Sequence, residues 1–214
     1  GDSLLHGRST DVAKQELHAR RVHVWDPTSI TPPEKDALDS WWDHFCRIYS
    51  ALVPIADATR TKLAMHPSDV PMPDTPFGGL GYHRIIDAFP SSQVGYLYCC
   101  GTRAEAGGLP LVLDEVHNYG RKGRIFMVHF RNVRASLATA QGYEEVALDD
   151  GDMNMFKILQ ELQRVGFDGC INPDHMPIVE GDWAENMNPS SKQVAHQALA
   201  YAIGYIKALL TALS

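Results

Sequence analysis

The chain repeats one pattern several times: a short apolar run, then a polar or proline-rich loop, then a segment with the periodicity of a helix. Apolar runs of this kind are typical of parallel strands that are buried on both faces. Their alternation with helices predicts a parallel sheet, either a barrel or an open doubly wound sheet. No glycine-rich nucleotide fingerprint follows any run, which favours the barrel. The four predicted strands are 63–65, 94–98, 125–128 and 169–171.

The first predicted helix begins near Thr31. This segment has the features of a helix start, which together leave few amide groups without a partner. They are a capping hydroxyl at Thr31, prolines in the first turn and Glu34 three residues after the cap. Apolar residues then recur at helical spacing as far as Leu52, and Pro54 is expected to stop or kink this helix. A second helical piece is predicted over 55–61. The later predicted helices are 81–89, 109–119, 153–165 and 191–213.

The length of 214 residues suits one domain with a sizeable core. We predict that residues 1–30 form an irregular or partly helical segment, with one short helix near 11–20. Residues 31–214 are predicted to form a single α/β domain of TIM-barrel type parallel βα units. Only four strands are recognised, so this domain corresponds to about half of an eight-stranded barrel.

Charge and composition exclude several classes of partner. The formal net charge of −7, without a basic stripe, argues against nucleic acid. No apolar run approaches the length of a membrane span and no signal peptide is recognisable, so we expect a cytoplasmic protein without a membrane partner. Four cysteines lack the spacing of a disulfide framework and are interpreted as thiols or thiolate ligands.

Each predicted strand is followed by a side chain that can bind a metal ion. These are His66, Cys99, His129 and Asp174. The carboxyl ends of successive strands in a parallel barrel meet on one face, so the four side chains are expected to converge. Two imidazoles, a thiolate and a carboxylate suit a divalent transition metal such as Mn²⁺, Fe²⁺ or Zn²⁺, and ligand type alone does not choose among them.

Two further residues are candidates for catalysis. Arg131 is expected to share a strand face with His129 and to clamp a substrate carboxylate. His175, next to Asp174, is a candidate general acid or base. Cys100 points away from Cys99 and is predicted to be structural. Any of these residues alone would more often be structural, and that interpretation is kept for His83, His117 and His196.

Five segments that include these residues resemble the mannonate dehydratase family, whose members are metal-dependent enzymes of the xylose-isomerase-like TIM-barrel group. The resemblance covers about residues 60 to 210. It implies dehydration of D-mannonate to 2-keto-3-deoxy-D-gluconate with Mn²⁺ or Fe²⁺, with His66, Cys99, His129 and Asp174 as metal ligands and His175 in proton transfer. The segments are 65–71, 99–102, 128–132, 150–155 and 173–175.

The chain departs from the pattern of this family in length and at several positions. A half-barrel has exposed sheet edges, so we expect either a homo-oligomer or a missing N-terminal half. The family's C-terminal tyrosine corresponds to Tyr201 or Tyr205. Two alternatives to the dehydratase are a related metal-dependent sugar isomerase or epimerase, and a catalytically incomplete fragment that only binds metal. The positions that differ are Ser68, Val70, Asn172 and Met176.

Overall fold

The structure is a computed structural model, and it describes residues 22–24, 34–68, 71, 77–78, 80–140, 142–177 and 196–214. The short helix predicted near 11–20, the cap at Thr31 and the start of the last helix at 191 lie outside these residues. Among the described residues, no helix is both long and apolar enough to cross a membrane.

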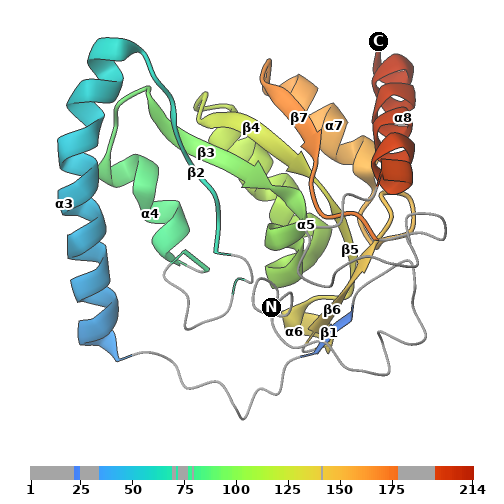
Figure 1. Cartoon of the computed structure of the whole chain (residues 1–214), viewed down its shortest axis with the longest axis horizontal. Coiled ribbons are helices and arrows are strands. Elements are labelled where there is room, and N and C mark those ends of the chain that lie inside the picture. The colour runs from blue at the N-terminus through green and yellow to red at the C-terminus, as the bar shows by residue number, and fades with distance from the viewer. Residues whose placement is uncertain are drawn as a thin grey trace.

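A four-stranded sheet forms the centre of the molecule (Figure 1). Its strand order is β2-β3-β4-β7 and every neighbouring pair is parallel. The four strands predicted from the sequence are thus confirmed, and β3, β4 and β7 continue beyond their predicted ends. Their bounds are Leu63–Met65 for β2, Val94–Cys99 for β3, Ile125–Phe130 for β4 and Cys170–Pro173 for β7.

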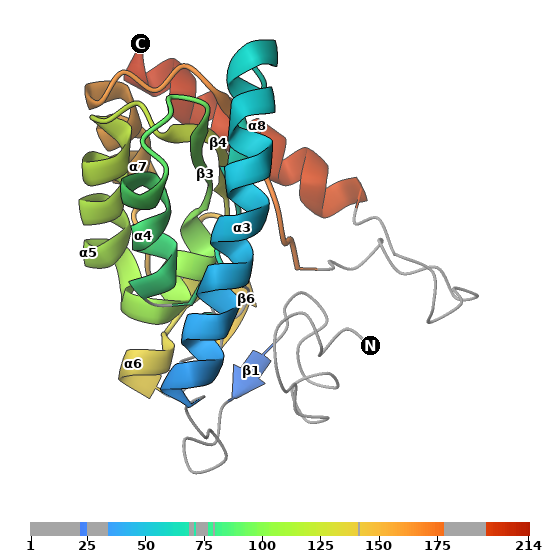
Figure 2. The same cartoon turned by 90° about the vertical axis from the view of Figure 1, so that its left-hand side faces the viewer.

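Three helices lie together on one side of the sheet (Figure 2), namely α4 (Leu80–Ala88), α5 (Cys100–Gly120) and α7 (Met155–Arg164). The main core fills the space between them and the strands. Fully buried aromatic side chains from β3 and β4 and aliphatic side chains from α5 and α7 contribute to it, including Tyr96, Tyr98, Phe130, Val112, Val116, Ile158 and Leu159.

Two more helices stand at the ends of the sheet (Figure 1). The helix α3 (Lys35–Thr59) lies beyond β2, and α8 (His196–Leu213) lies beside α7. Pro54 does not end α3, which continues to Thr59 as one helix. Buried side chains on both sides of the proline, Tyr49 and Ala56, offset the backbone hydrogen bond that proline removes.

The helix α5 begins directly after β3, much earlier than predicted. A non-helical Gly108, with φ of 69°, separates its first part from the part that follows Pro110. The glycines and the proline at this break indicate a loop when only the sequence is considered. The first part of the helix, 100–107, was therefore missed.

A second, antiparallel sheet was also not predicted. Its order is β1-β6-β5, with β5 starting just after β4 ends. The strand β6 contains Glu144 and Glu145, and such short, charged strands lack the apolar pattern from which strands are predicted. The bounds are Val22–Val24 for β1, Asn132–Arg134 for β5 and Gly142–Val146 for β6, and the short helix α6 spans Leu137–Ala140.

Candidate metal centre

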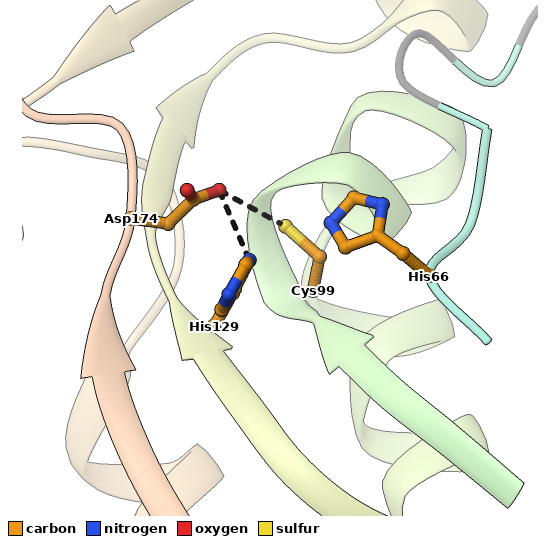
Figure 3. A group of neighbouring side chains, drawn as sticks. All are labelled: His66, Cys99, His129 and Asp174. Atoms are coloured by element: carbon orange, nitrogen blue, oxygen red, sulfur yellow. Dashed lines mark hydrogen bonds and ion pairs between the residues drawn. The ribbon is translucent and has the colours of Figure 1, made fainter. Parts of the chain in front are cut away.

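The four predicted ligands come from the carboxyl-terminal ends of the four parallel strands (Figure 3). Cys99 ends β3 and pairs in register with His129 of β4, while His66 and Asp174 directly follow β2 and β7. One potential ligand atom from each residue lies within 4.8 Å of the other three. The structure therefore brings the predicted set together, because parallel strands in register present their last residues at one edge of the sheet.

Direct contacts join these side chains. Asp174 Oδ2 lies 3.3 Å from His129 Nδ1 and 3.8 Å from Cys99 Sγ. On the other side of the group, the rings of His66 and His129 have centroids 5.3 Å apart. His66 Nδ1 lies 2.7 Å from the carbonyl oxygen of Pro67, and an N–H donated to that oxygen would make Nε2 the nitrogen that can bind a metal ion.

The charges within this group are strongly coupled. Burial would raise the pKa of Cys99, but hydrogen bonds with His129 and His66 and the charge of Arg131 lower it to about 6. Burial would lower the pKa of His129, but hydrogen bonds with Asp174 and Cys99 raise it to about 10. Near neutral pH the group thus contains a thiolate and an imidazolium. A bound metal ion would replace the positive charge of that imidazolium proton.

The donor set fits a divalent transition metal. Burial would raise the pKa of Asp174, but the hydrogen bond from His129 and the charges of His175 and His129 lower it to about 2. A carboxylate and a thiolate therefore face two imidazoles within one small volume. Transition-metal sites in proteins use these same borderline ligands.

His175 lies between this group and a buried carboxylate. Its Nε2 is 3.6 Å from Asp174 Oδ2, and its Nδ1 is 3.5 Å from Glu145 Oε2. Burial would lower the pKa of His175, and the interaction with Glu145 raises it above the ordinary value. The residue predicted to transfer a proton is thus adjacent to the candidate metal ligands.

Arg131 is placed differently from the prediction. Its side chain is 0% exposed and donates from Nε and Nη2 to both oxygens of Glu145, at 2.7 and 2.6 Å. Its Nη2 also lies 2.6 Å from Glu105 Oε1. The expected role as a substrate clamp does not fit this placement, because a guanidinium without exposed surface cannot reach a substrate.

Residues 34–214 match the family model of D-mannonate dehydratase (UxuA). The chain belongs to this family. Mannonate dehydratase 2 of Halalkalibacterium halodurans is 28% identical over 165 residues, which are 73% of this chain and 46% of the relative. The mannonate dehydratase of Streptococcus uberis is 26% identical over 196 residues, 88% of this chain and 52% of the relative. The chain spans about half the length of the curated relatives it matches.

Solved structures agree on the fold. The crystal structure of mannonate dehydratase from Streptococcus suis serotype 2 has a TM-score of 0.68 and 21% identity, and the match covers 90% of this chain and 59% of that one. A xylose isomerase domain protein from Planctomyces limnophilus has a TM-score of 0.56 and 15% identity, with coverage of 86% and 56%. The four parallel βα units of this mannonate dehydratase family member are therefore of the TIM-barrel type.

Sequence reasoning missed the buried polar residues around Arg131. Glu145 lies in the unpredicted strand β6, and Glu105 and Thr102 lie in the unpredicted first part of α5. One signal was present in the sequence, namely the glycine at position 101. The structure explains it, because a Cβ at Gly101 would lie 2.5 Å from Arg131 Cδ. A glycine that opens a helix beside a buried strand end indicates a close approach of this kind.

The other candidates lie outside the set of His66, Cys99, His129 and Asp174, which we call the metal group. Cys100 is buried in the core, as predicted, and burial raises the pKa of its thiol well above the ordinary value. The Tyr201 hydroxyl donates to Asp149 Oδ2 at 2.5 Å, and Tyr205 stacks on Tyr201. His83 and His117 contact the carboxylates of Glu115 and Glu161, and His196 is exposed on α8.

Proposed function

We propose that this chain carries the metal-binding and proton-transfer residues of a sugar-acid dehydratase that converts D-mannonate to 2-keto-3-deoxy-D-gluconate and water. The observation that supports this most is the convergence of His66, Cys99, His129 and Asp174 within 4.8 Å, with His175 beside them. Membership of the D-mannonate dehydratase family supports the choice of reaction.

In the reaction a base takes the proton on C2, the carbon next to the carboxylate, and the hydroxyl on C3 accepts a proton and leaves as water. The resulting enol then becomes the 2-keto acid. When bound to the four ligands, a Mn²⁺ or Fe²⁺ ion would supply a Lewis acid for the substrate's carboxylate and hydroxyl oxygens, and Zn²⁺ also suits this donor set. The remaining requirement is a side chain that moves protons.

His175 meets that requirement in position and in chemistry. Its Nε2 faces Asp174, a proposed metal ligand, at 3.6 Å, so a substrate held there lies within reach of this nitrogen. The raised pKa of His175, caused mainly by Glu145, keeps more of the ring protonated near neutral pH. We assign it the delivery of a proton to the departing hydroxyl.

The test is a direct assay of the metal-loaded chain. The protein is loaded with Mn²⁺ or with Fe²⁺ under argon and incubated with D-mannonate and a panel of other aldonic acids, and 2-keto-3-deoxy acids are detected colorimetrically. We expect product from D-mannonate. We expect His175→Ala to abolish it while retaining metal, and His117→Ala, which alters a histidine bound to Glu161, to leave it unchanged. Absence of product from every acid, with bound metal confirmed, refutes the proposal.

A further inference from the structure

The two ring nitrogens of His175 face two different carboxylates. Nε2 is 3.6 Å from Asp174 in the metal group, and Nδ1 is 3.5 Å from Glu145 on the opposite side of the ring. The hydrogen bond made by one nitrogen of an imidazole fixes the ring's orientation and the tautomer available at the other nitrogen. The partner of Nδ1 therefore decides which nitrogen His175 presents to the metal group.

Glu145 is built to be a fixed partner. Its side chain is 5% exposed and belongs to β6, which is paired on both sides by β1 and β5. Arg131 donates to both of its carboxylate oxygens, the two-point geometry that holds a carboxylate most firmly. Burial would raise the pKa of Glu145, but the charge of Arg131 lowers it, so the group remains an ionised acceptor.

His175 gives Glu145 a contact in addition to Arg131. Two buried carboxylates, Glu105 and Glu145, contact the guanidinium of Arg131, and the side chains of Arg131 and Glu105 are both 0% exposed. The Nδ1 of His175, 3.5 Å from Glu145 Oε2, supplies an N–H beside a carboxylate that is buried with this arginine. Loss of the Glu145 charge would still leave Arg131 paired with Glu105.

The same arginine is linked to the metal group by a second route. Arg131 Nη1 donates to Thr102 Oγ1 at 3.2 Å, and Thr102 Oγ1 donates to Cys99 Sγ at 3.2 Å. Arg131 thus connects, through Glu145 and through Thr102, to His175 and to a proposed metal ligand. Its buried position suits this supporting role, whereas a substrate clamp needs an accessible guanidinium.

We propose that Glu145, held in place by Arg131, is the positioning residue that accepts the Nδ1–H of His175 and so directs Nε2 toward the reacting substrate. The role in the reaction rests on the proposed dehydratase function. The orientation of the ring does not, and it can be measured without substrate.

The kinetic test compares Glu145→Gln with Glu144→Gln. Both residues lie on β6, but Glu144 contacts Arg134 near the surface. With the Mn²⁺-loaded chain and D-mannonate, we expect Glu145→Gln to lower kcat about 10- to 100-fold, the usual effect of removing the partner that orients a site histidine, with KM and metal content nearly unchanged. Glu144→Gln should retain the wild-type kcat. Equal kcat values for the two variants, or metal loss that accounts for the whole effect, overturn the proposal.

The spectroscopic test needs no activity. Histidine ¹⁵N signals are recorded on the Zn²⁺-loaded chain, and His175 is assigned from a His175→Gln variant. We expect a protonated Nδ1 in the wild type and in Glu144→Gln, and a mixture of tautomers in Glu145→Gln. An unchanged His175 signal in Glu145→Gln overturns the proposal, whether or not D-mannonate is dehydrated.

Glu145→Asp guards against misfolding of the glutamine variant. It keeps the charge beside Arg131 and shortens the side chain by one methylene, so the carboxylate retreats from His175. We expect the same changes in kcat and in the His175 signal, in the same direction. Wild-type values for a folded Glu145→Asp, together with an unfolded Glu145→Gln, would show that Glu145 serves stability alone and would refute the positioning role.

Discussion

Metal binding at this site should release one proton from His129. At pH 8 a group whose pKa is about 10 is almost fully protonated, whereas Cys99, at about 6, is already a thiolate and Asp174, at about 2, is already a carboxylate. A metal ion can bind only the neutral imidazole, so it must displace that proton. We therefore expect about one proton per metal ion bound at pH 8.

The same displacement sets the pH dependence of the affinity. Removing a proton two pH units below its pKa costs about 2.7 kcal/mol, so the apparent affinity at pH 8 should be about 100-fold below its limit. It should fall about tenfold for each pH unit between 10 and 6, and more steeply below 6, where the Cys99 thiolate also takes up a proton.

Calorimetry measures this release. Titrations of the metal-free chain with Mn²⁺ at pH 8, in buffers of different ionisation enthalpy, give the proton count from the slope of the observed heat against that enthalpy. His117→Ala is the matched control and should give the wild-type slope. A slope near zero would mean that His129 is neutral or does not bind the metal. A slope near two would mean that Cys99 is still a thiol at this pH. Either result refutes the charge assignment.

Three further predictions concern stability and assembly. Glu115→Gln should lower the free energy of unfolding in urea by about 3–5 kcal/mol, because Glu115 is a buried partner of Arg103 and Tyr98. The control Asp114→Asn, at an exposed position, should change this free energy by less than about 0.5 kcal/mol. Similar values for the two variants would contradict this prediction. Gly101→Ala should lower the free energy of unfolding by about 1–3 kcal/mol, because its Cβ would lie 2.5 Å from Arg131. Gly204→Ala, where the added Cβ meets open space in α8, should raise it by about 0.5–1 kcal/mol. Equal melting temperatures for the two variants would refute this contrast. Mass measurement in solution should show association, because β2 and β7 are the end strands of the parallel sheet in the described part of the chain. A stable, compact monomer would contradict that expectation.

The sequence was sufficient for the parallel strands and for the convergence of the four proposed ligands. The apolar runs before His66, Cys99 and His129 are nearly continuous, and the topology of a parallel sheet then fixes where their ends meet. Local pattern and global topology agree at these positions, so a one-dimensional argument was enough.

The surroundings of Arg131 could not be predicted in the same way. The alternation of side chains along a strand suggested that Arg131 shares the face of His129 and is open to a substrate, but its side chain is 0% exposed. The direction of Arg131 is instead set by Glu145 and Glu105, which lie in elements without a clear apolar period. Buried ion pairs depend on contacts between distant segments, and such contacts leave no periodic signal in the sequence.

The most direct test of the central claim is the metal content of three purified variants loaded and desalted in parallel with the wild type. Cys99→Ser and His129→Ala each remove one proposed ligand, and His83→Ala alters a histidine that contacts Glu115 instead. We predict close to one metal ion per chain for the wild type and His83→Ala, and much less than one for the two ligand variants. Metal content equal to that of the wild type in both Cys99→Ser and His129→Ala would contradict the proposed coordination.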